Sequence, residues 1–296
     1  MRVLITGAAG LVASHFARRL ARDHEVLALR HSDLDISDGD AVTGTVARFR
    51  PDLLINGAVV QVDEAEDNRA KAQAVNEEGP RILAQAANRV GAEMMHFGTQ
   101  YVFAGEPVGR QPYTIEDEAR PVNHYGRTKF AGEKGVRNAC ARSYIIRASW
   151  IYGSGKNSFL CTVCEDLKSA KTVRAIDDIW SSTTYVEDLI DRCLEILKRQ
   201  SYGTYHVVND GVCTYYEFAL EAGNLLGLSR GQTDALVQIT RERDMKRAAA
   251  RPHYTPLRCL LSEELGLPPM RHWKVALAAY AQESRSVSSP RSCVSG

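Results

Sequence analysis

The sequence predicts an α/β fold: a doubly wound parallel sheet followed by a smaller C-terminal lobe. Short apolar runs alternate with segments of helical spacing through the first half of the chain, as in parallel strands joined by crossover helices. A glycine-rich turn directly follows the first apolar run. The 296 residues are 44% hydrophobic and 25% charged, which are ordinary values for a globular protein with a sizeable core.

The alternation assigns the elements of the first 150 residues in order. Apolar runs predict strands, and apolar residues every three to four positions predict helices. Because strand–helix–strand crossovers are right-handed, helices should cover both faces of the sheet. The predicted strands are 2–6, 25–29, 53–56, 93–97 and 144–147, and the predicted helices are 10–22, 38–49, 66–90 (continuous or broken) and 123–140.

After residue 150 the alternation loosens. We interpret residues 1–150 as one domain and 151–283 as mixed segments that complete the sheet and form the smaller lobe. Residues 284–296 are rich in serine and lack an apolar period, so we expect a disordered tail there. In the second half the predicted helices are 157–170, 186–198 and 215–226, and the predicted strands are 204–208 and 237–240.

Charge and hydropathy exclude several classes of partner. Lysine plus arginine number 37 against 36 for aspartate plus glutamate, a net charge of +1, so we expect neither nucleic acid nor a membrane as partner. No apolar run reaches the ~18 residues of a membrane span, and the chain does not start with a signal-peptide pattern. We therefore expect a cytoplasmic protein. The seven scattered cysteines predict no metal site.

The turn after the first strand carries a dinucleotide-binding fingerprint. Residues 6–13 contain Gly7, Gly10 and Ala13 in GxxGxxA spacing. Gly7 permits a tight turn, Gly10 lets the backbone approach a pyrophosphate, and Ala13 lets the helix pack closely on the sheet. The N–H groups at the helix start, including that of Leu11, would hold the phosphates. The first domain is therefore predicted to be a dinucleotide-binding (Rossmann) domain.

The end of the second predicted strand indicates which cofactor binds. NAD sites usually place an Asp or Glu there to hold the ribose hydroxyls, but this strand ends in Arg30 and His31. A guanidinium can bind a 2′-phosphate with two hydrogen bonds. The sequence therefore favours NADPH (NADP+) over NAD(H). Asp35 and Ile36 follow at a spacing suited to contacts with the adenine.

A tyrosine and a lysine form a candidate catalytic pair. Tyr125 and Lys129 are four residues apart in a predicted helix, so both side chains lie on one face. A cation beside a phenol lowers its pKa and makes it a usable general acid near neutral pH. Thr99 follows the fourth strand, at the sheet edge where such folds carry chemistry, and can hydrogen-bond the same substrate oxygen.

These motifs resemble the extended short-chain dehydrogenase/reductase superfamily, and within it most closely the dTDP-4-dehydrorhamnose reductase family. The resemblance covers roughly residues 1 to 275, and its pieces fall in the family's order. It implies NADPH-dependent reduction of the 4-keto group of a nucleotide-diphospho-6-deoxy-4-keto sugar, with the smaller lobe binding that sugar. The matching segments are 7–13, 50–52, 56–58, 62–66, 75–76, 98–105, 121–129, 132–134, 147–153 and 251–252.

The resemblance also implies roles for single residues. It assigns catalysis to Thr99, Tyr125 and Lys129, and it places Arg251 near the nucleotide diphosphate, which a guanidinium suits by its fork geometry. Trp150 would lie near the sugar. The remaining candidates are Ala58, Asn76 and Ser149 for the cofactor and Gln100, Asn157 and Trp180 for the substrate.

Three positions depart from the family pattern. Gln100 stands where the family has an aspartate, and Trp180 lies in a stretch where the family tends to have glycine and proline. Both put the contacts to the sugar in doubt. His15 stands where some members carry an acidic residue linked to a magnesium site between subunits. We therefore expect no metal and leave a homodimer open.

Two alternative functions stay open at this point. The regulatory subunit of methionine adenosyltransferase is similar to the same family, which would make this chain a non-catalytic, dinucleotide-binding regulatory subunit. The other alternative is a nucleotide-sugar epimerase or dehydratase with tightly held NAD. Such enzymes usually keep an acid at the end of the second strand, which Arg30 and His31 do not supply.

Overall fold

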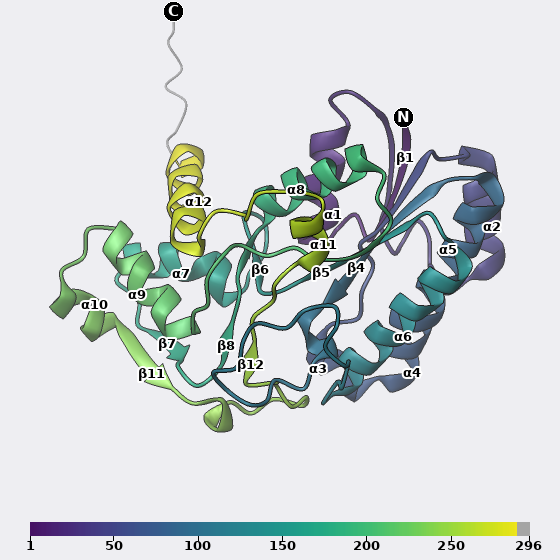
Figure 1. Ribbon diagram of the computed structural model, residues 1–296. Coiled ribbons are helices and arrows are strands. Elements are labelled where there is room, and N and C mark those ends of the chain that lie inside the picture. The colour runs from purple at the N-terminus through teal and green to yellow at the C-terminus, as the bar shows by residue number, and fades with distance from the viewer. Residues whose placement is uncertain (289–296) are drawn as a thin grey trace, which may run out of the picture.

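The computed structural model describes residues 1–288, and within them six parallel strands form the central sheet (Figure 1). The strand order is β10-β5-β4-β3-β1-β2, so the predicted parallel α/β fold is confirmed. The strand β10 comes from the second half of the chain, as the sequence predicted. The strands are β1 (Arg2–Thr6), β2 (Glu25–Leu29), β3 (Leu53–Asn56), β4 (Glu93–Thr99), β5 (Ser143–Ala148) and β10 (Gly203–His206).

The direction of the strand order reverses at β1. The chain passes from β1 to β2 on one side and then returns to place β3 on the other side of β1, with Thr6 opposite Asn56. The loops that follow β1 and β3 therefore leave in opposite directions. In open α/β sheets this divergence opens a crevice at the carboxyl ends of the strands, where ligands bind.

Helices cover both faces of the sheet. On one face α1 packs against α8, and on the other α2, α5 and α6 form a second hydrophobic cluster. The predicted helix over residues 66–90 is broken into α-helices and a π-helical turn, Gln73–Glu78. The helices are α1 (Leu11–Leu20), α2 (Gly39–Phe49), α3 (Val62–Asp67), α4 (Arg69–Ala72), α5 (Gly79–Val90), α6 (His124–Ala139) and α8 (Val186–Arg199).

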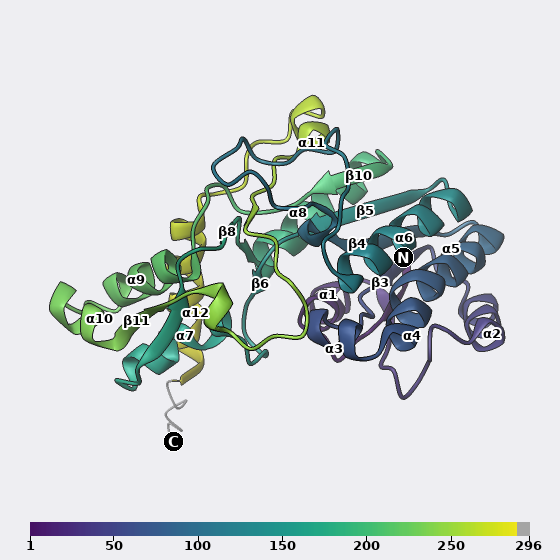
Figure 2. The same cartoon turned by 90° about the horizontal axis from the view of Figure 1, so that it is seen from below.

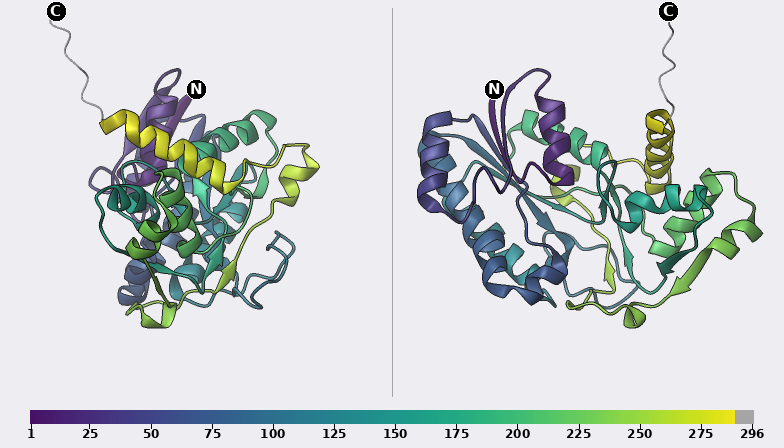
Figure 3. Two further views of the ribbon diagram at one scale, coloured as in Figure 1. Left: turned by 90° about the vertical axis from the view of Figure 1, so that its left-hand side faces the viewer. Right: turned by 180° about the vertical axis from the view of Figure 1, so that it is seen from behind.

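The second lobe lies beside the sheet, as Figures 1, 2 and 3 show from different sides. It is built on β7, which pairs in parallel with β11, and on the helices α7, α9 and α10. The sequence pattern did not predict strand β7 or helix α10. The bounds are α7 (Phe159–Lys168), β7 (Val173–Ile176), α9 (Tyr215–Leu225), α10 (Arg230–Leu236) and β11 (Val237–Thr240).

Short elements connect the two lobes. Strand β8 pairs with β12, and β6 pairs with β9. They place late segments of the chain against the ends of the main sheet, which the sequence pattern did not predict. The bounds are η2 (Gln100–Val102), β6 (Ile151–Tyr152), β8 (Trp180–Ser181), β9 (Thr184–Tyr185), η3 (Glu242–Asp244), β12 (Tyr254–Thr255) and α11 (Leu260–Glu264).

The last described element is the helix α12 (Trp273–Ser288). This helix includes residues 284–288 of the segment that we expect to be disordered, and the rest of that segment lies outside the described residues. The helical signal was present in the sequence, because Trp273, Leu277 and Tyr280 are buried at helical spacing. The serine-rich composition that follows obscured it.

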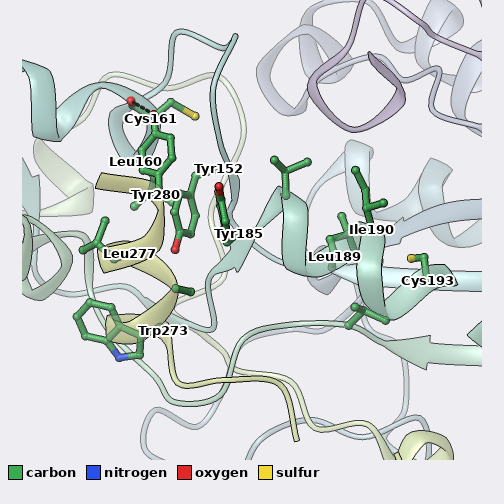
Figure 4. Close-up of a cluster of buried hydrophobic side chains, with 14 of the residues drawn as sticks. Tyr152, Leu160, Cys161, Tyr185, Leu189, Ile190, Cys193, Trp273, Leu277 and Tyr280 are labelled. Carbon is green, nitrogen blue, oxygen red and sulfur yellow. Dashed lines mark hydrogen bonds between the residues drawn. The ribbon is translucent and has the colours of Figure 1, made fainter. Parts of the chain in front are cut away.

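One hydrophobic cluster continues from the sheet into the second lobe (Figure 4). The rings of Tyr152, Tyr185 and Tyr280 lie 5.5 to 5.9 Å apart between centroids. The hydroxyl of Tyr280 donates to the carbonyl oxygen of Cys161 in α7, at 2.6 Å. The core therefore includes residues from both sides of residue 150, and it fixes the second lobe against the first. No helix in residues 1–288 is long and apolar enough to cross a membrane.

Candidate active site

A cavity of about 490 Å³ opens at the carboxyl ends of the central strands. Its walls come from both lobes, because residues after β1, β3, β4 and β5 face residues of the second lobe across it. The structure therefore brings together most of the residues that the sequence proposed for catalysis and binding. The predicted residues that line it are Gly10, Leu11, Ala58, Thr99, Gln100, Tyr125, Lys129 and Trp150.

The glycine turn shapes one end of this cavity. Gly7 has φ of +69°, and a β-carbon there would lie 2.5 Å from the backbone nitrogen of Ala58. A β-carbon on Gly57 would lie 2.9 Å from that of Ala13, so the small Ala13 lets α1 approach the end of β3. Gly10 is the N-cap of helix α1; it makes no side-chain cap hydrogen bond, and the first turn of the helix has no acidic residue. Its free N–H groups fit a pyrophosphate.

The residues proposed for the adenosine end lie apart from the central cavity. Arg30 is exposed directly after β2. The Asp35 carboxylate accepts hydrogen bonds from the hydroxyl and the backbone of Ser37, and the hydrogen bond from that hydroxyl lowers the pKa of Asp35. Ile36 is buried beneath this loop. Asp35 lines a separate, open hollow with His31. The roles of Arg30, Asp35 and Ile36 stay predictions.

Two predicted cofactor residues support the cavity from outside its lining. Asn76 accepts the N–H of Val60 at 2.8 Å and donates to its carbonyl at 3.0 Å. The Ser149 hydroxyl lies 2.6 Å from that of Ser181. Both side chains are buried. Asn76 and Ser149 therefore hold loops in place around the cavity.

Helix α6 presents the predicted catalytic pair. The side chain of Asn123 caps the helix by accepting the N–H of Gly126 at 2.8 Å, which places Tyr125 in the first turn and Lys129 one turn later on the same face. At the end of β4, the hydroxyl of Thr99 lies beside the side chain of Tyr125 and donates to Oε1 of Gln100 at 3.0 Å. The predicted catalytic residues therefore meet at one wall of the cavity.

The protonation of this pair differs from the sequence prediction. Burial raises the pKa of Tyr125 and the neighbouring Thr99 hydroxyl opposes that shift, whereas the sequence predicts that Lys129 lowers it. The Lys129 amine instead contacts the carbonyl oxygen of Phe97 at 2.5 Å. Burial lowers the pKa of Lys129 to about 8, against the opposing charge of Glu133. Tyr125 thus keeps its proton at neutral pH, the state that a general acid requires.

Aromatic rings form another part of the cavity wall. Trp150, which has φ of +41°, stacks on Tyr215 of α9 with ring centroids 3.9 Å apart and planes inclined by 30°. Non-glycine residues rarely adopt this backbone conformation, and such strain is common at binding sites. The Phe159 ring meets the edge of Tyr215 at 5.5 Å. Two lobes therefore contribute to one aromatic surface beside the catalytic residues.

The other predicted substrate residues lie at different places. Arg251 lines a small cavity that adjoins the first and shares Gln100 and Trp150 with it. Asn157 is exposed, next to residues that line the main cavity. Trp180 belongs to β8, where it pairs with Tyr254 of β12, and does not line the cavity.

Sequence reasoning missed the basic residues of the second lobe. Lys156, Arg174 and Arg247 line the cavity. Arg174 donates to the hydroxyl of Thr240 at 3.0 Å, and Arg247 pairs with Glu242 at 2.9 Å. They come from separate segments that follow no shared motif, so only the folded chain brings them together. The other second-lobe residues of the lining include Ser158, Phe159, Leu160, Ile176, Tyr215 and Met245.

His15 makes a contact between helices. Its Nδ1 lies 2.6 Å from Oε1 of Glu187 in α8, and its Nε2 lies 2.9 Å from the carbonyl oxygen of Ser154. Within residues 1–288 no three His, Cys, Asp or Glu side chains are grouped so that they could hold a metal ion.

Comparisons with known proteins identify the family. The family described as RmlD substrate binding domain matches residues 1–286. The chain is 37% identical over 303 residues to a dTDP-4-dehydrorhamnose reductase of Streptomyces griseus, covering 98% of both chains. It is 34% identical over 287 residues to the spore coat polysaccharide biosynthesis protein SpsK of Bacillus subtilis, covering 96% of this chain and 98% of that protein. A solved structure of dTDP-4-dehydrorhamnose reductase from Bacillus anthracis in complex with NADP has a TM-score of 0.88 at 31% identity, covering 95% of this chain and 99% of that one. With a match along nearly its whole length, the chain belongs to the RmlD substrate binding domain family.

Proposed function

We propose that this protein uses NADPH to reduce the 4-keto group of a nucleotide-diphospho-6-deoxy-4-keto sugar. The observation that carries the proposal is the meeting of Thr99, Tyr125 and Lys129 at one cavity that also contains the free N-terminus of α1. Relatives of 37% and 31% identity are named dTDP-4-dehydrorhamnose reductase, and the second is a complex with NADP. The arrangement of the residues in the cavity and the names of the relatives both point to an NADPH-dependent reduction.

The catalytic residues supply the proton of the reaction. NADPH, when bound, supplies the hydride that adds to the keto carbon. The phenol of Tyr125, protonated because burial raises its pKa, donates its proton to the keto oxygen. We assign Thr99 a hydrogen bond to that same oxygen, for which its hydroxyl turns from Oε1 of Gln100, 3.0 Å away. The ketone thereby gains one hydride at carbon and one proton at oxygen, which makes an alcohol.

The second lobe supplies the groups that a nucleotide diphosphate requires. Lys156, Arg174 and Arg247 line the same cavity as the proposed catalytic residues, and cations bind phosphate oxygens through charge-assisted hydrogen bonds. The stacked rings of Trp150 and Tyr215 present flat apolar area at the same wall, which suits a base or a sugar ring. We assign the diphosphate and the sugar to this wall.

The alternatives from the sequence have less support. A regulatory subunit needs no general acid, yet the catalytic set is complete and faces a cavity. An epimerase or dehydratase with tightly held NAD needs an acid for the ribose, and Arg30 and His31 follow β2 instead. A cytoplasmic location and a homodimer stay predictions of the sequence.

The test is the oxidation of NADPH, followed by absorbance, with dTDP-4-keto-6-deoxyglucose and its 3,5-epimerised form. Turnover by the wild type should fall roughly 100- to 10,000-fold in the Tyr125→Phe variant, the usual contribution of a general acid. The matched control is Tyr202→Phe, which removes a hydroxyl that donates to Glu93. Absence of turnover in folded wild-type protein that binds NADPH would contradict the proposal for these sugars.

A further inference from the structure

A chain of buried side chains leads from β1 to the catalytic lysine. The hydroxyl of Thr6 donates to Oδ1 of Asn56 at 2.8 Å, and Nδ2 of Asn56 lies 3.1 Å from Nδ1 of His96. The other ring nitrogen, Nε2 of His96, lies 3.5 Å from the amine of Lys129. All four side chains are at most 3% exposed. The chain crosses three neighbouring strands, β1, β3 and β4, and ends at α6.

Counting donors and acceptors fixes the orientation of each group. The backbone N–H of Ala58 points to Oδ1 of Asn56 at 3.1 Å. A backbone N–H only donates, so this end of the Asn56 amide is its oxygen and the end facing His96 is its NH₂ group. Nδ1 of His96 must then accept. A neutral His96 therefore carries its proton on Nε2 and points that proton at Lys129.

His96 is neutral in this environment. Burial holds the pKa of His96 well below its ordinary value, and the neighbouring Lys129 lowers it further. An ammonium has three donors and no acceptor, so it repels an N–H aimed at it, whereas an amine offers a lone pair. The second contact of Lys129, with the carbonyl of Phe97, can be made by either form. His96 therefore favours the amine form of Lys129.

Other groups near Lys129 act in the opposite sense. Glu133, one turn further along α6, favours the ammonium, although its carboxylate is paired with Arg147 of β5 at 2.8 Å. The phenols of Tyr125 and Tyr101, whose rings meet edge to face, line the same cavity as Lys129. Two neighbours therefore have opposite effects on the protonation of Lys129: Glu133 favours the ammonium, and His96 favours the amine.

We propose that His96 is a positioning residue that keeps Lys129 able to change between amine and ammonium, so that Lys129 can return a proton to Tyr125 after each reduction. The Lys129 ammonium gives one proton to the Tyr125 phenolate and becomes an amine. The amine then takes a proton from solvent water in the cavity, which Lys129 lines. The kinetic role rests on the proposed reductase function, whereas the hydrogen-bond arrangement does not.

The first experiment tests the arrangement without any substrate. Nitrogen-15 NMR of histidine-labelled protein should show one histidine that carries its proton on Nε2 and does not titrate between about pH 5.5 and 8.5. The His96→Gln variant assigns that signal among the eight histidines. A His96 protonated on Nδ1, or one that titrates in this range, would overturn the proposal whatever the enzyme's activity.

The second experiment measures pH profiles of kcat. In His96→Gln the amide can turn its oxygen toward Lys129, and in Asn56→Asp the carboxylate draws the His96 proton to Nδ1 and leaves a lone pair facing Lys129. Both changes favour the ammonium. The basic limb of kcat should therefore move up by about one pH unit or more, a tenfold change in proton concentration.

A merely structural role for His96 would lower kcat equally at every pH. His24→Gln, a change in the turn between α1 and β2, is the matched control and should leave the profile in place. A basic limb that does not move in either folded variant, Asn56→Asp or His96→Gln, would overturn the kinetic part of the proposal. A wild type inactive on every sugar tested would instead count against the reductase function and leave the NMR result standing.

Discussion

Arg251 forms an ion pair with Asp63 through both ends of its guanidinium, with Nη1 3.0 Å from Oδ1 and Nη2 2.7 Å from Oδ2. The two residues are 188 positions apart, so the pair connects a late segment of the chain to helix α3. The Arg251 side chain is only 9% exposed. Asp63 thereby holds a cation at the edge of the cavity that we assign to the nucleotide sugar.

Replacement of Arg251 should weaken substrate binding. Hydrogen bonds to charged groups contribute about 1.5–3 kcal/mol, so KM for the nucleotide sugar should rise roughly 10- to 100-fold in Arg251→Ala. Arg251→Lys keeps the charge but cannot make the paired contact, and it should recover only part of the loss. Steady-state kinetics measure both. A change in the Kd for NADPH of similar size would show that Arg251 acts on the whole fold.

The turn at Gly7 should tolerate no side chain. A β-carbon there would lie 2.5 Å from backbone atoms of Gly57 and Ala58, at φ of +69°. We expect Gly7→Ala to lower the free energy of unfolding by about 2 kcal/mol or more and to weaken NADPH binding. Urea denaturation and fluorescence titration measure these effects. Gly44→Ala in α2 is the control, because nothing lies within 4 Å of that position, and it should stabilise by about 0.5–1 kcal/mol.

Burial of Lys129 should make stability depend on pH. Its pKa falls from 10.5 in a free side chain to about 8, so the unfolded chain holds this proton more tightly. The cost of about 3 kcal/mol, at about 1.4 kcal/mol per unit, is fully present below pH 8 and disappears as the pH rises through 10.5. Lys129→Met should therefore be more stable than wild type at pH 7, and this advantage should shrink toward pH 10.5.

Urea denaturation at several pH values tests this prediction for Lys129. The control is Lys134→Met, because Lys134 lies on the exposed side of the same helix. That substitution should show no such dependence between pH 7 and 10.5. A Lys129→Met variant that is less stable than wild type at every pH would mean that the hydrogen bond to Phe97 outweighs the cost of burying the charge.

Arg30 should decide between the two nicotinamide cofactors. It is exposed directly after β2, at the edge of the sheet where the fingerprint turn lies. If it binds the 2′-phosphate, Arg30→Ala should raise the Kd for NADPH roughly 10- to 100-fold, as expected for a lost charge-assisted hydrogen bond. The Kd for NADH, which lacks that phosphate, should stay unchanged. Equal weakening for both cofactors would assign the phosphate to another group.

Local patterns in the sequence predicted much of the first domain. The strands of the sheet are predicted by the short-range pattern of apolar residues. The turn at Gly7 is predicted by the conformational freedom of the glycine backbone. Both signals can be recognised in the sequence without knowledge of the fold. The spacing of Tyr125 and Lys129 placed both on one face of α6, and the structure puts both at the cavity. The pKa of Tyr125 was predicted in the wrong direction, because burial and the contact of Lys129 with Phe97 depend on the packing of β4 against α6.

The sequence by itself determined the strands of the first domain, the fingerprint turn and the spacing that puts Tyr125 and Lys129 on one helix face, because each is encoded within a few neighbouring residues. Only the tertiary structure decided which groups share a cavity with Thr99, Tyr125 and Lys129. Arg174, Tyr215 and Arg247 come from distant segments that a common core brings together. The pairing of Arg251 with Asp63 was decided in the same way. Contacts between distant segments depend on how whole layers pack, and no short stretch of sequence carries that information.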